Sequence, residues 1–264
     1  MKENNMLKLA SWNVNSIKIR LEQVLAWLKE NNIDILALQE TKSIDEQFPM
    51  QAFKDYGYSV ICSGQKTYNG VAIISKYPVE NVITDVSGFV DPQRRILAVT
   101  IAGLRLINLY VPNGSMVGSD KYEYKLNWLS KVTQFVQAEL RQHPLVAVVG
   151  DFNIAPEDRD VHAPLEWEGS VLVSALERQA FFGLLDLGLK DSFRNFERSE
   201  QLYSWWDYRA ASFRRNRGLR IDHILLSSAL NAQCQACEID ILPRKGERPS
   251  DHAPIWVSLT HKFS

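Results

Sequence analysis

Side chains suited to acid–base and metal chemistry recur in this sequence where apolar stretches end. The end of a strand on a rigid sheet is where such groups can be held at fixed distances. There are five such places: Asn13 with Asn15, Glu40, Asp151 with Asn153, Asp222, and Asp251 with His252. Any one of them could equally cap a turn or lie on the surface. Together they provide the groups that a metal-assisted attack on a phosphate ester requires.

The donor atoms at these places indicate which metal is expected. Carboxylate and amide oxygens suit Mg²⁺, with Mn²⁺ as the alternative, because these ions bind through a few carboxylates, water and substrate phosphate. Zinc is disfavoured because the five places hold no cysteine and a single histidine. Hydrolysis of a phosphodiester also needs an activated water and a counter to the developing negative charge. Asp151, His252 and the metal can supply both.

Hydrophobic periodicity outlines the elements that must position these residues. The chain opens with a strand at residues 7–14, a helix with an apolar face from Leu21 to Leu28, and a strand at 33–38. Further strands are expected at 59–63, 70–75, around Val82, at 96–101, 104–110 and 145–149, near Tyr203, and at 221–226 and 255–259. Longer helices are expected at about 120–141 and 174–187.

This order of elements predicts an α/β fold. No linker, low-complexity tract or repeat interrupts it, so residues 1–264 are expected to form a single domain. Strands dominate both halves of the chain. The simplest architecture that buries them has two sheets packed face to face, with helices on the outer faces.

The overall composition is that of an ordinary globular protein and does not indicate a nucleic-acid partner. Of the 264 residues, 45% are hydrophobic and 23% are charged, and the net charge is −1. The informative feature is local: between Trp205 and Arg220, five arginines and one acid are interleaved with four aromatic residues. That mixture suits a phosphate backbone and unstacked bases, and it also suits a solvated basic loop.

Cysteine usage indicates a reducing compartment. Cys62, Cys234 and Cys237 are too few for a disulfide framework. The CxxC at 234–237 favours structural thiols in a strand over a zinc site, because no second pair or nearby histidine accompanies it. The sequence shows neither a signal-peptide pattern nor a transmembrane run, so a cytoplasmic location is expected.

Six segments carry the residues named above together with their neighbours. They are residues 11–15 (SWNVN), 38–42 (LQETK), 110–113 (YVPN), 150–153 (GDFN), 218–223 (GLRIDH) and 249–254 (PSDHAP). In this order they resemble the motifs of the exonuclease III and AP endonuclease family. The resemblance implies a four-layered α/β sandwich of the endonuclease/exonuclease/phosphatase superfamily, with two mostly antiparallel sheets and the active site at one edge.

The same resemblance implies an activity and its partners. The expected reaction is Mg²⁺-dependent hydrolysis of double-stranded DNA at abasic sites, nicks, gaps or 3′ ends. It would take the form of AP endonuclease, 3′-to-5′ exodeoxyribonuclease or 3′-phosphatase activity in DNA repair. We expect a monomer without a membrane partner.

Roles for individual residues also follow from the resemblance. Glu40 would be the principal metal ligand, and the residues expected to border the metal site are Asn13, Asp151, Asn153, Asp251 and His252. Asp151 would orient or deprotonate the attacking water, and Asn153 would position it. Asp222 would hold His252 against the scissile phosphate, which Tyr110 and Asn113 would also contact. Independently of any family, a carboxylate beside His252 orients the imidazole and favours its protonated form.

The resemblance places the contacts to DNA less directly. Trp205 and Leu219 would form the apolar walls of a pocket for a flipped-out sugar that has lost its base, which excludes a normal nucleotide by size. The alternative for Trp205 is an ordinary core aromatic. Arg209 would enter the duplex, and Tyr68 would touch the backbone.

Two questions stay open at the level of sequence. The segment 156–173, with His162, Trp167 and Glu168, either leaves that pocket open to an abasic nucleotide or closes it, and a closed pocket would favour trimming of 3′-phosphates and 3′ nucleotides. Two rival functions are a phosphodiesterase for a non-DNA phosphoester, such as a phosphoinositide, and a DNA-binding relative without catalysis. Residues 39–42 and the arginine and aromatic cluster favour DNA.

Overall fold

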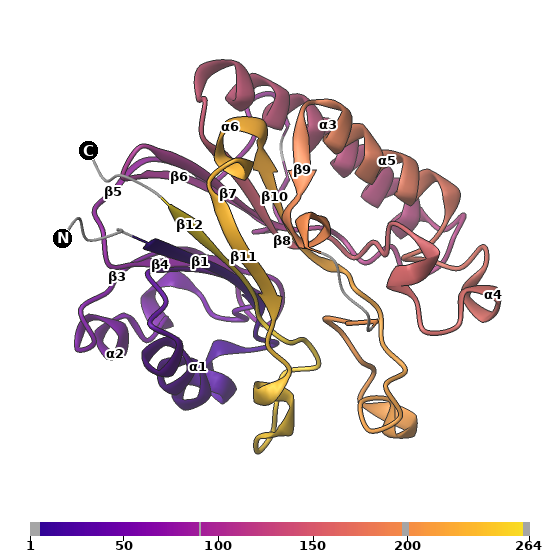
Figure 1. The fold of residues 1–264 in the computed structure, drawn as a ribbon, viewed down its shortest axis with the longest axis horizontal. Helices are drawn as coiled ribbons and strands as arrows, with labels where there is room; N and C mark the ends of the chain where they lie inside the picture. The colour runs from indigo at the N-terminus through magenta and orange to yellow at the C-terminus, as the bar shows by residue number, and fades with distance from the viewer. Residues whose placement is uncertain (1–5, 90, 197–200, 261–264) are drawn as a thin grey trace.

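Two six-stranded sheets form the centre of the protein in a computed structural model that describes residues 6–89, 91–196 and 201–260 (Figure 1). Across the first sheet, the strands are β11 (Cys234–Ile239), β12 (Ile255–Thr260), β1 (Met6–Asn13), β2 (Ile35–Gln39), β4 (Val71–Ser75) and β3 (Ser59–Ser63). Across the second, they are β5 (Val79–Ile83), β6 (Ile96–Ile101), β7 (Leu104–Tyr110), β8 (Val146–Asp151), β10 (Asp222–Ser227) and β9 (Leu189–Asp191).

The longer helices lie on the outer faces of the two sheets (Figure 1). The first sheet is covered by α1 (Ile17–Asn31) and α2 (Met50–Lys54), and the second by α3 (Asp120–Gln142) and α5 (Ala175–Asp186). Shorter elements are α4 (Pro164–Trp167), α6 (Ser228–Asn231) and 3₁₀ turns at Asp45–Gln47, Asp158–Asp160, Ser192–Asn195, Arg209–Ala211 and Leu242–Lys245. Within the described part of the chain, no helix is both long and apolar enough to cross a membrane.

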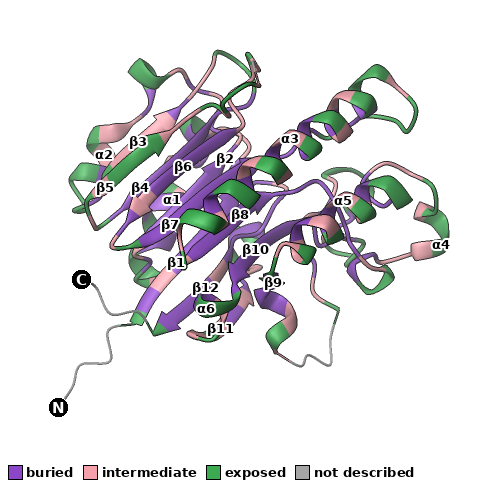
Figure 2. Ribbon diagram, turned by 90° about the horizontal axis from the view of Figure 1, so that it is seen from above, coloured by how far each residue is buried: buried purple, intermediate pink, exposed green. Residues whose placement is uncertain are grey.

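The alternation of side chains along β1 shows how the layers are held together. Leu9 faces the second sheet and packs in a core that also holds Leu106 and Val257. Trp12 faces the opposite way and packs against α1. A third apolar layer, which includes Phe152, joins the second sheet to α3 and α5. The central strands are accordingly buried, while the outer helix surfaces and parts of the edge strands β3 and β5 are exposed (Figure 2), and the predicted four-layered sandwich is confirmed.

Each sheet contains one parallel pair of strands, and these two pairs explain where the site forms. β1 runs parallel to β2 with Asn13 opposite Gln39, and β7 runs parallel to β8 with Tyr110 opposite Asp151. The other paired strands are antiparallel, so the sheets are mostly antiparallel as predicted. The carboxyl ends of parallel strands meet at one edge of a sheet. Residues that follow β1, β2, β7 and β8 therefore lie near one another.

The strands entering from the other side complete this edge. β10 begins at Asp222, directly opposite Asp151 of the antiparallel strand β8. β12 begins at Ile255, opposite Ser11, so the residues just before it, including His252, reach the same edge. Residues far apart in the sequence are thus brought together by sheet register.

The predicted strands differ from the observed ones at two places. The strand expected near Tyr203 is wrong, because the backbone there makes only isolated bridges from Trp205 to Leu219 and His252. The strand expected around the CxxC is present as β11, and neither of its cysteines is in a disulfide. β9 was not predicted, since it has only three residues and a lysine at its centre.

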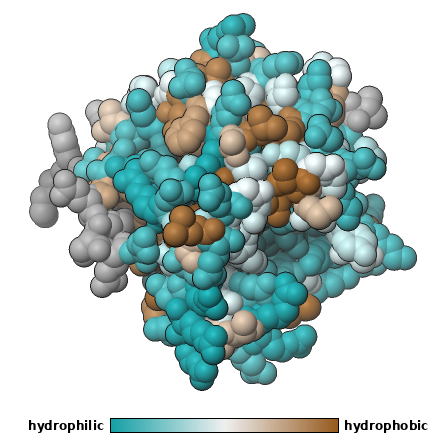
Figure 3. Space-filling view, turned by 90° about the vertical axis from the view of Figure 1, so that its right-hand side faces the viewer, coloured by the Kyte–Doolittle hydropathy of each residue, from teal (hydrophilic) through white to brown (hydrophobic). Residues whose placement is uncertain are grey.

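Hydrophobic side chains on the face that carries α4 are scattered among hydrophilic ones (Figure 3).

Candidate active site

The side chains predicted at the strand ends meet at the edge shared by the two sheets. The Asn13 amide nitrogen Nδ2 donates to Oε1 of Glu40 at 3.1 Å and to Oδ2 of Asp151 at 2.9 Å. One amide therefore joins an acid from the first sheet to an acid from the second. On the other side of Asp151, its Oδ2 lies 3.8 Å from Nε2 of His252. Glu40, Asp151 and His252 therefore lie together in one cluster.

Glu40 is held as an ionised carboxylate at the end of β2. Its backbone adopts φ 51°, a conformation that L residues disfavour, and the Ser16 amide donates to its carbonyl at 2.7 Å. The Tyr110 hydroxyl donates to Oε1 at 2.7 Å, and Nζ of Lys42 lies 3.0 Å from Oε2. Burial alone would raise the pKa of Glu40, but Lys42 and the two side-chain donors lower it below its usual value.

Asp151 is fully buried, and its environment differs from that of Glu40. Its Oδ1 accepts from the backbone amide of Asn153 at 2.9 Å. Burial raises the pKa of Asp151 to about 7, although His252 and the Asn13 hydrogen bond act in the opposite direction. A carboxylate whose pKa lies near neutral pH is suited to accept a proton from water.

His252 and Asp222 form a buried pair. Nδ1 of His252 lies 2.9 Å from Oδ2 of Asp222. Burial alone would lower the pKa of His252, but the carboxylates of Asp222 and Asp151 raise it to about 10. The imidazole is then protonated at neutral pH, so Nδ1 donates to Asp222 and Nε2 can donate toward a bound anion.

Asn113 and Asn153 approach each other beside Asp151. The Asn113 amide nitrogen Nδ2 donates to Oδ1 of Asn153 at 3.1 Å, and Nδ2 of Asn153 donates to the Val111 carbonyl at 3.0 Å. Asn153 has φ 50°, so its turn is held in a left-handed conformation. Asn113 is exposed while Asn153 is buried, which leaves Asn113 able to reach a ligand outside the protein.

A divalent cation fits the chemistry of this edge. Asp151, Asp222 and His252 offer ligand atoms that all lie within 4.8 Å of one another, and Oδ1 of the buried Asp222 has no hydrogen-bond partner among the described residues. The ionised Glu40, which Asn13 joins to Asp151, adds a further carboxylate at this edge. These oxygen-rich surroundings suit Mg²⁺ or Mn²⁺.

Asp251 is linked to Glu40 through two intermediate side chains. Asn15 donates to Oδ1 of Asp251 at 2.9 Å, and its own Oδ1 accepts from Nζ of Lys42 at 2.6 Å. Lys42 in turn pairs with Glu40. The Trp205 indole Nε1 donates to Oδ2 of Asp251 at 3.0 Å. Asn15 was among the polar residues noted at the strand ends but was given no role, and Lys42 was not predicted as a site residue, although both lie inside the motif segments quoted above.

Known proteins resemble this chain over nearly its whole length. A sequence profile described as the Endonuclease/Exonuclease/phosphatase family matches residues 10–252. The chain belongs to this family. Exodeoxyribonuclease III of Haemophilus influenzae is 35% identical to it over 96% of this chain and 100% of the relative. The chain therefore belongs to the exonuclease III and AP endonuclease group of the Endonuclease/Exonuclease/phosphatase family.

Solved structures of this family superpose closely on the fold. A 3′ phosphatase from Neisseria, bound to a product DNA hairpin, is 44% identical, with a TM-score of 0.94 over 96% of this chain and 99% of the other. An AP endonuclease from Archaeoglobus fulgidus is 40% identical, with a TM-score of 0.92 over the same shares of the two chains. A 3′ phosphatase and an AP endonuclease are thus about equally similar to this chain.

The residues expected to contact DNA in a family member lie around the cluster, with different exposures. Leu219 is fully buried and Trp205 is half-buried, and the two pair through backbone hydrogen bonds. Trp205 packs against a small apolar cluster and also donates to Asp251. Arg209 is exposed, and its guanidinium pairs with Asp207 at 2.7 Å. Tyr68 is 68% exposed. It precedes Asn69, whose carbonyl accepts a hydrogen bond from the backbone amide of Lys42.

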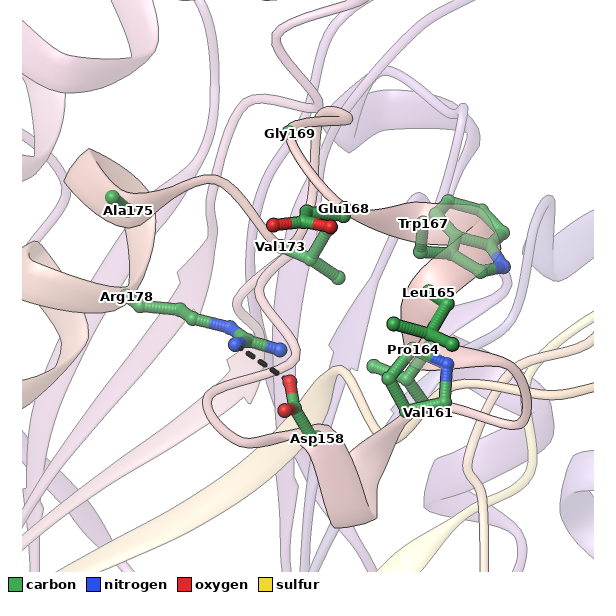
Figure 4. Close-up of a pocket in the computed structure, with 10 residues that line it drawn as sticks. All are labelled: Asp158, Val161, Pro164, Leu165, Trp167, Glu168, Gly169, Val173, Ala175 and Arg178. Carbon is green, nitrogen blue, oxygen red and sulfur yellow. Dashed lines mark hydrogen bonds and ion pairs between the residues drawn. The ribbon is translucent and has the colours of Figure 1, made fainter.

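The segment 156–173 lies against the wall that Leu219 forms. Val161 bridges to Leu219, and both the backbone amide and the ring Nδ1 of His162 lie 3.2 Å from the Gly218 carbonyl. The Trp167 ring packs edge-on against His162, with centroids 6.3 Å apart. A cavity of about 530 Å³ opens between this segment and α5 (Figure 4). None of the predicted site residues lines it, so the chemistry lies elsewhere.

Proposed function

We propose that this chain hydrolyses phosphodiester or phosphomonoester bonds in double-stranded DNA with the help of a divalent cation. The observation that carries the proposal is the convergence of Glu40, Asp151 and the His252–Asp222 pair, linked through Asn13, at one edge of the sandwich. Family membership and the relative bound to a DNA hairpin support DNA as the substrate.

The charges of the cluster define the roles of its members. Asp151, with its pKa near neutrality, accepts a proton from the attacking water, which Asn153 orients. His252, held protonated by Asp222, donates from Nε2 to an oxygen of the scissile phosphate and offsets the negative charge that develops there. Asn113 adds a hydrogen-bond donor for the same phosphate, and Tyr110 would do so by turning its hydroxyl proton from Glu40 toward it.

Mg²⁺ is the cation we propose, with Mn²⁺ as a substitute. Glu40 would hold it with the oxygens of Asn13 and Asp251, and Asp151, Asn153 and His252 would border the same site. When bound, the cation supplies positive charge to the phosphate and to the leaving oxygen. Glu40 is suited to this role because its carboxylate is already ionised.

Processing of 3′ ends is the activity that the segment 156–173 favours. His162 packs on the backbone next to Leu219, and Trp167 packs on His162, so the segment would narrow the space where a flipped-out sugar would enter. Cleavage at abasic sites is the second candidate. It is supported by the paired Trp205 and Leu219 and by the AP endonuclease among the similar structures. Arg209 and Tyr68 are proposed contacts to the duplex.

The remaining proposals concern the setting of the enzyme. The three cysteines are thiols rather than disulfides, which favours the reducing environment of the cytoplasm. We propose that residues 1–264 act as one domain and as a monomer, with nicked, gapped or recessed duplexes as partners. A non-DNA phosphoester is disfavoured by the arginine and aromatic cluster. A silent DNA-binding relative is disfavoured by the complete catalytic set.

Three duplexes distinguish these possibilities at identical Mg²⁺ and salt concentrations: one with a single abasic analogue, one with a 3′-phosphate at a nick, and one with a recessed 3′ end. Salt must be fixed because phosphate contacts make binding strongly dependent on ionic strength. We expect turnover of the two 3′-end substrates to exceed cleavage at the abasic site. Hydrolysis of an inositol polyphosphate in preference to all three duplexes would contradict the proposed function, as would no turnover at all.

A further inference from the structure

Lys125 is a charged side chain enclosed in the protein directly beneath the cluster. It lies on α3, and its side chain is 0% exposed. Its Nζ donates to the backbone carbonyl of Asn153 at 2.7 Å and to that of Asn113 at 3.2 Å, and it pairs with Glu177. An ammonium group has three protons to donate, and these three partners use them all. One buried lysine therefore holds both turns that carry the two active-site amides.

The position of Lys125 is itself fixed. Glu177, at the start of α5, is equally buried and also accepts from the backbone amides of Leu172 and Ser174 and from the Ser174 hydroxyl. Gly114 packs so closely that a Cβ atom there would lie 3.1 Å from Cδ of Lys125. The lysine side chain thus has little freedom, and the ion pair fixes Nζ relative to both α3 and α5.

The turn at Asn153 needs such support. Its φ of 50° is a conformation that residues with a side chain disfavour. The backbone amide and the side chain of Asn153 are held by Asp151 and Val111, and the carbonyl is held by Lys125. Without Lys125, that buried carbonyl would lose a charged donor and the turn could relax. The Asn113–Asn153 contact would then be displaced relative to Asp151.

We propose that Lys125 is a positioning residue for phosphate ester hydrolysis, which fixes Asn113 and Asn153 relative to Asp151 without touching the substrate. This inference rests on the proposed function. A positioning role of this kind affects the geometry of attack more than the binding of DNA, because the proposed duplex contacts Arg209 and Tyr68 are not among the partners of Lys125.

The test compares two double variants that each remove a buried ion pair made by α3. Lys125→Met with Glu177→Gln removes the pair beneath the cluster. Arg105→Met with Glu139→Gln removes a second pair, which Glu139 of the same helix makes with β7. We expect the first variant to lower kcat on a nicked 3′-phosphate duplex by about 10- to 100-fold with little change in KM. The control should retain kcat when both are assayed well below their Tm.

Equal kcat values for the two folded double variants would overturn the proposal. If the first variant shows no cooperative unfolding transition, and so is not properly folded, Lys125→Arg is the variant to assay. It keeps the buried charge, while its longer, planar head group displaces the two carbonyls. A lowered kcat with unchanged KM supports the positioning role, and a wild-type kcat overturns it. A wild-type chain that is inactive on every duplex overturns the proposed function itself and this inference with it.

Discussion

Nδ1 of His252 lies 2.9 Å from Oδ2 of Asp222, and both side chains are buried. In this contact the imidazole gains a fixed orientation and a stabilised positive charge, which burial alone would oppose. The carboxylate thereby determines the pH range over which His252 can act as a donor to phosphate. That range can be measured.

Replacing Asp222 with Asn removes the negative charge and should lower the pKa of His252. In the wild type, activity is expected to fall on the alkaline side as pH rises through about 10, where the imidazole loses its proton. In Asp222→Asn, this alkaline limb should move to lower pH by about one to two units. The pH dependence of kcat/KM tests this, with the exposed Asp186→Asn as control. A profile identical to the wild type would count against the pairing.

The same contact has a consequence for stability. The folded pKa of His252 is raised above the unfolded value of about 6.5, so its stabilisation is fully present below that pH and is lost as pH rises through about 10. Asp222→Asn should therefore narrow the difference in free energy of unfolding between pH 6 and pH 10. Urea unfolding at the two pH values measures it, and an unchanged difference would contradict the assigned charge.

Asp151→Asn should abolish turnover while DNA binding survives. The amide keeps the shape of the side chain but cannot accept a proton from water, so we expect kcat to fall by about 10²- to 10⁴-fold. Single-turnover cleavage and fluorescence anisotropy of a labelled duplex, at one salt concentration, separate the two effects. A rate near that of the wild type would refute the role given to Asp151.

Asp160 anchors the segment 156–173 through a buried arginine. Nε of Arg220 donates to Oδ1 of Asp160 at 2.6 Å, and the guanidinium also pairs with Asp191 at 2.8 Å. Removing one partner of such a buried pair costs about 3–5 kcal/mol of stability. Asp160→Asn should therefore lower the free energy of unfolding at pH 7 by an amount in this range. Asp158→Asn, on the exposed side of the same turn, should cost much less.

The Asp160 variant also makes a prediction about acid stability. Burial alone would raise the pKa of Asp160, but Arg220 outweighs it and lowers the pKa. Its stabilisation is present above the unfolded pKa of about 3.9 and is lost as pH falls through the lower folded value. Asp160→Asn should lose less stability below pH 4 than the wild type does. Equal acid losses in urea unfolding would show that Arg220 does not depend on this charge.

His162 provides a test of substrate choice. Because its ring packs on the Gly218 carbonyl beside Leu219, His162→Ala should open space at the wall of the sugar pocket. We expect the ratio of abasic-site cleavage to 3′-phosphate release to rise by about tenfold or more, which corresponds to roughly 1.4 kcal/mol. Leu165→Ala, exposed on the same segment, is the control. An unchanged ratio would show that the segment does not decide the substrate.

Much of this site could be predicted from the sequence, because the register of the sheets determines which strand ends lie together. Asn13, Glu40, Asp151 and Asp222 are polar residues at the limits of apolar runs. The parallel pairs β1–β2 and β7–β8 bring the first three together, and the antiparallel pairing of β10 with β8 places Asp222 opposite Asp151. The strand expected near Tyr203 failed for a physical reason. Tyr203 and Trp206 pack into the core between the two sheets, and Trp205 makes only isolated bridges, so no continuous ladder forms.

Residues that act through tertiary contacts were harder to predict. Lys125 stands at a buried position of α3, where a lysine is uncommon, and the sequence does not reveal that Glu177, 52 positions later, completes the pair. Arg220 lies in a motif, but its partners Asp160 and Asp191 lie in a loop and a short strand without periodicity. Such contacts depend on how the loops pack.

Glu40 is the residue proposed to hold the cation, and the other proposed roles depend on it. The most direct measurement is the Mg²⁺ dependence of 3′-phosphate release from a nicked duplex, after chelation, for the wild type, Glu40→Gln and the exposed control Glu46→Gln. We predict no turnover before Mg²⁺ is added, and a half-saturating Mg²⁺ concentration about tenfold or more higher in Glu40→Gln alone. Full activity of the chelated wild type, or identical Mg²⁺ curves for all three proteins, would contradict the account.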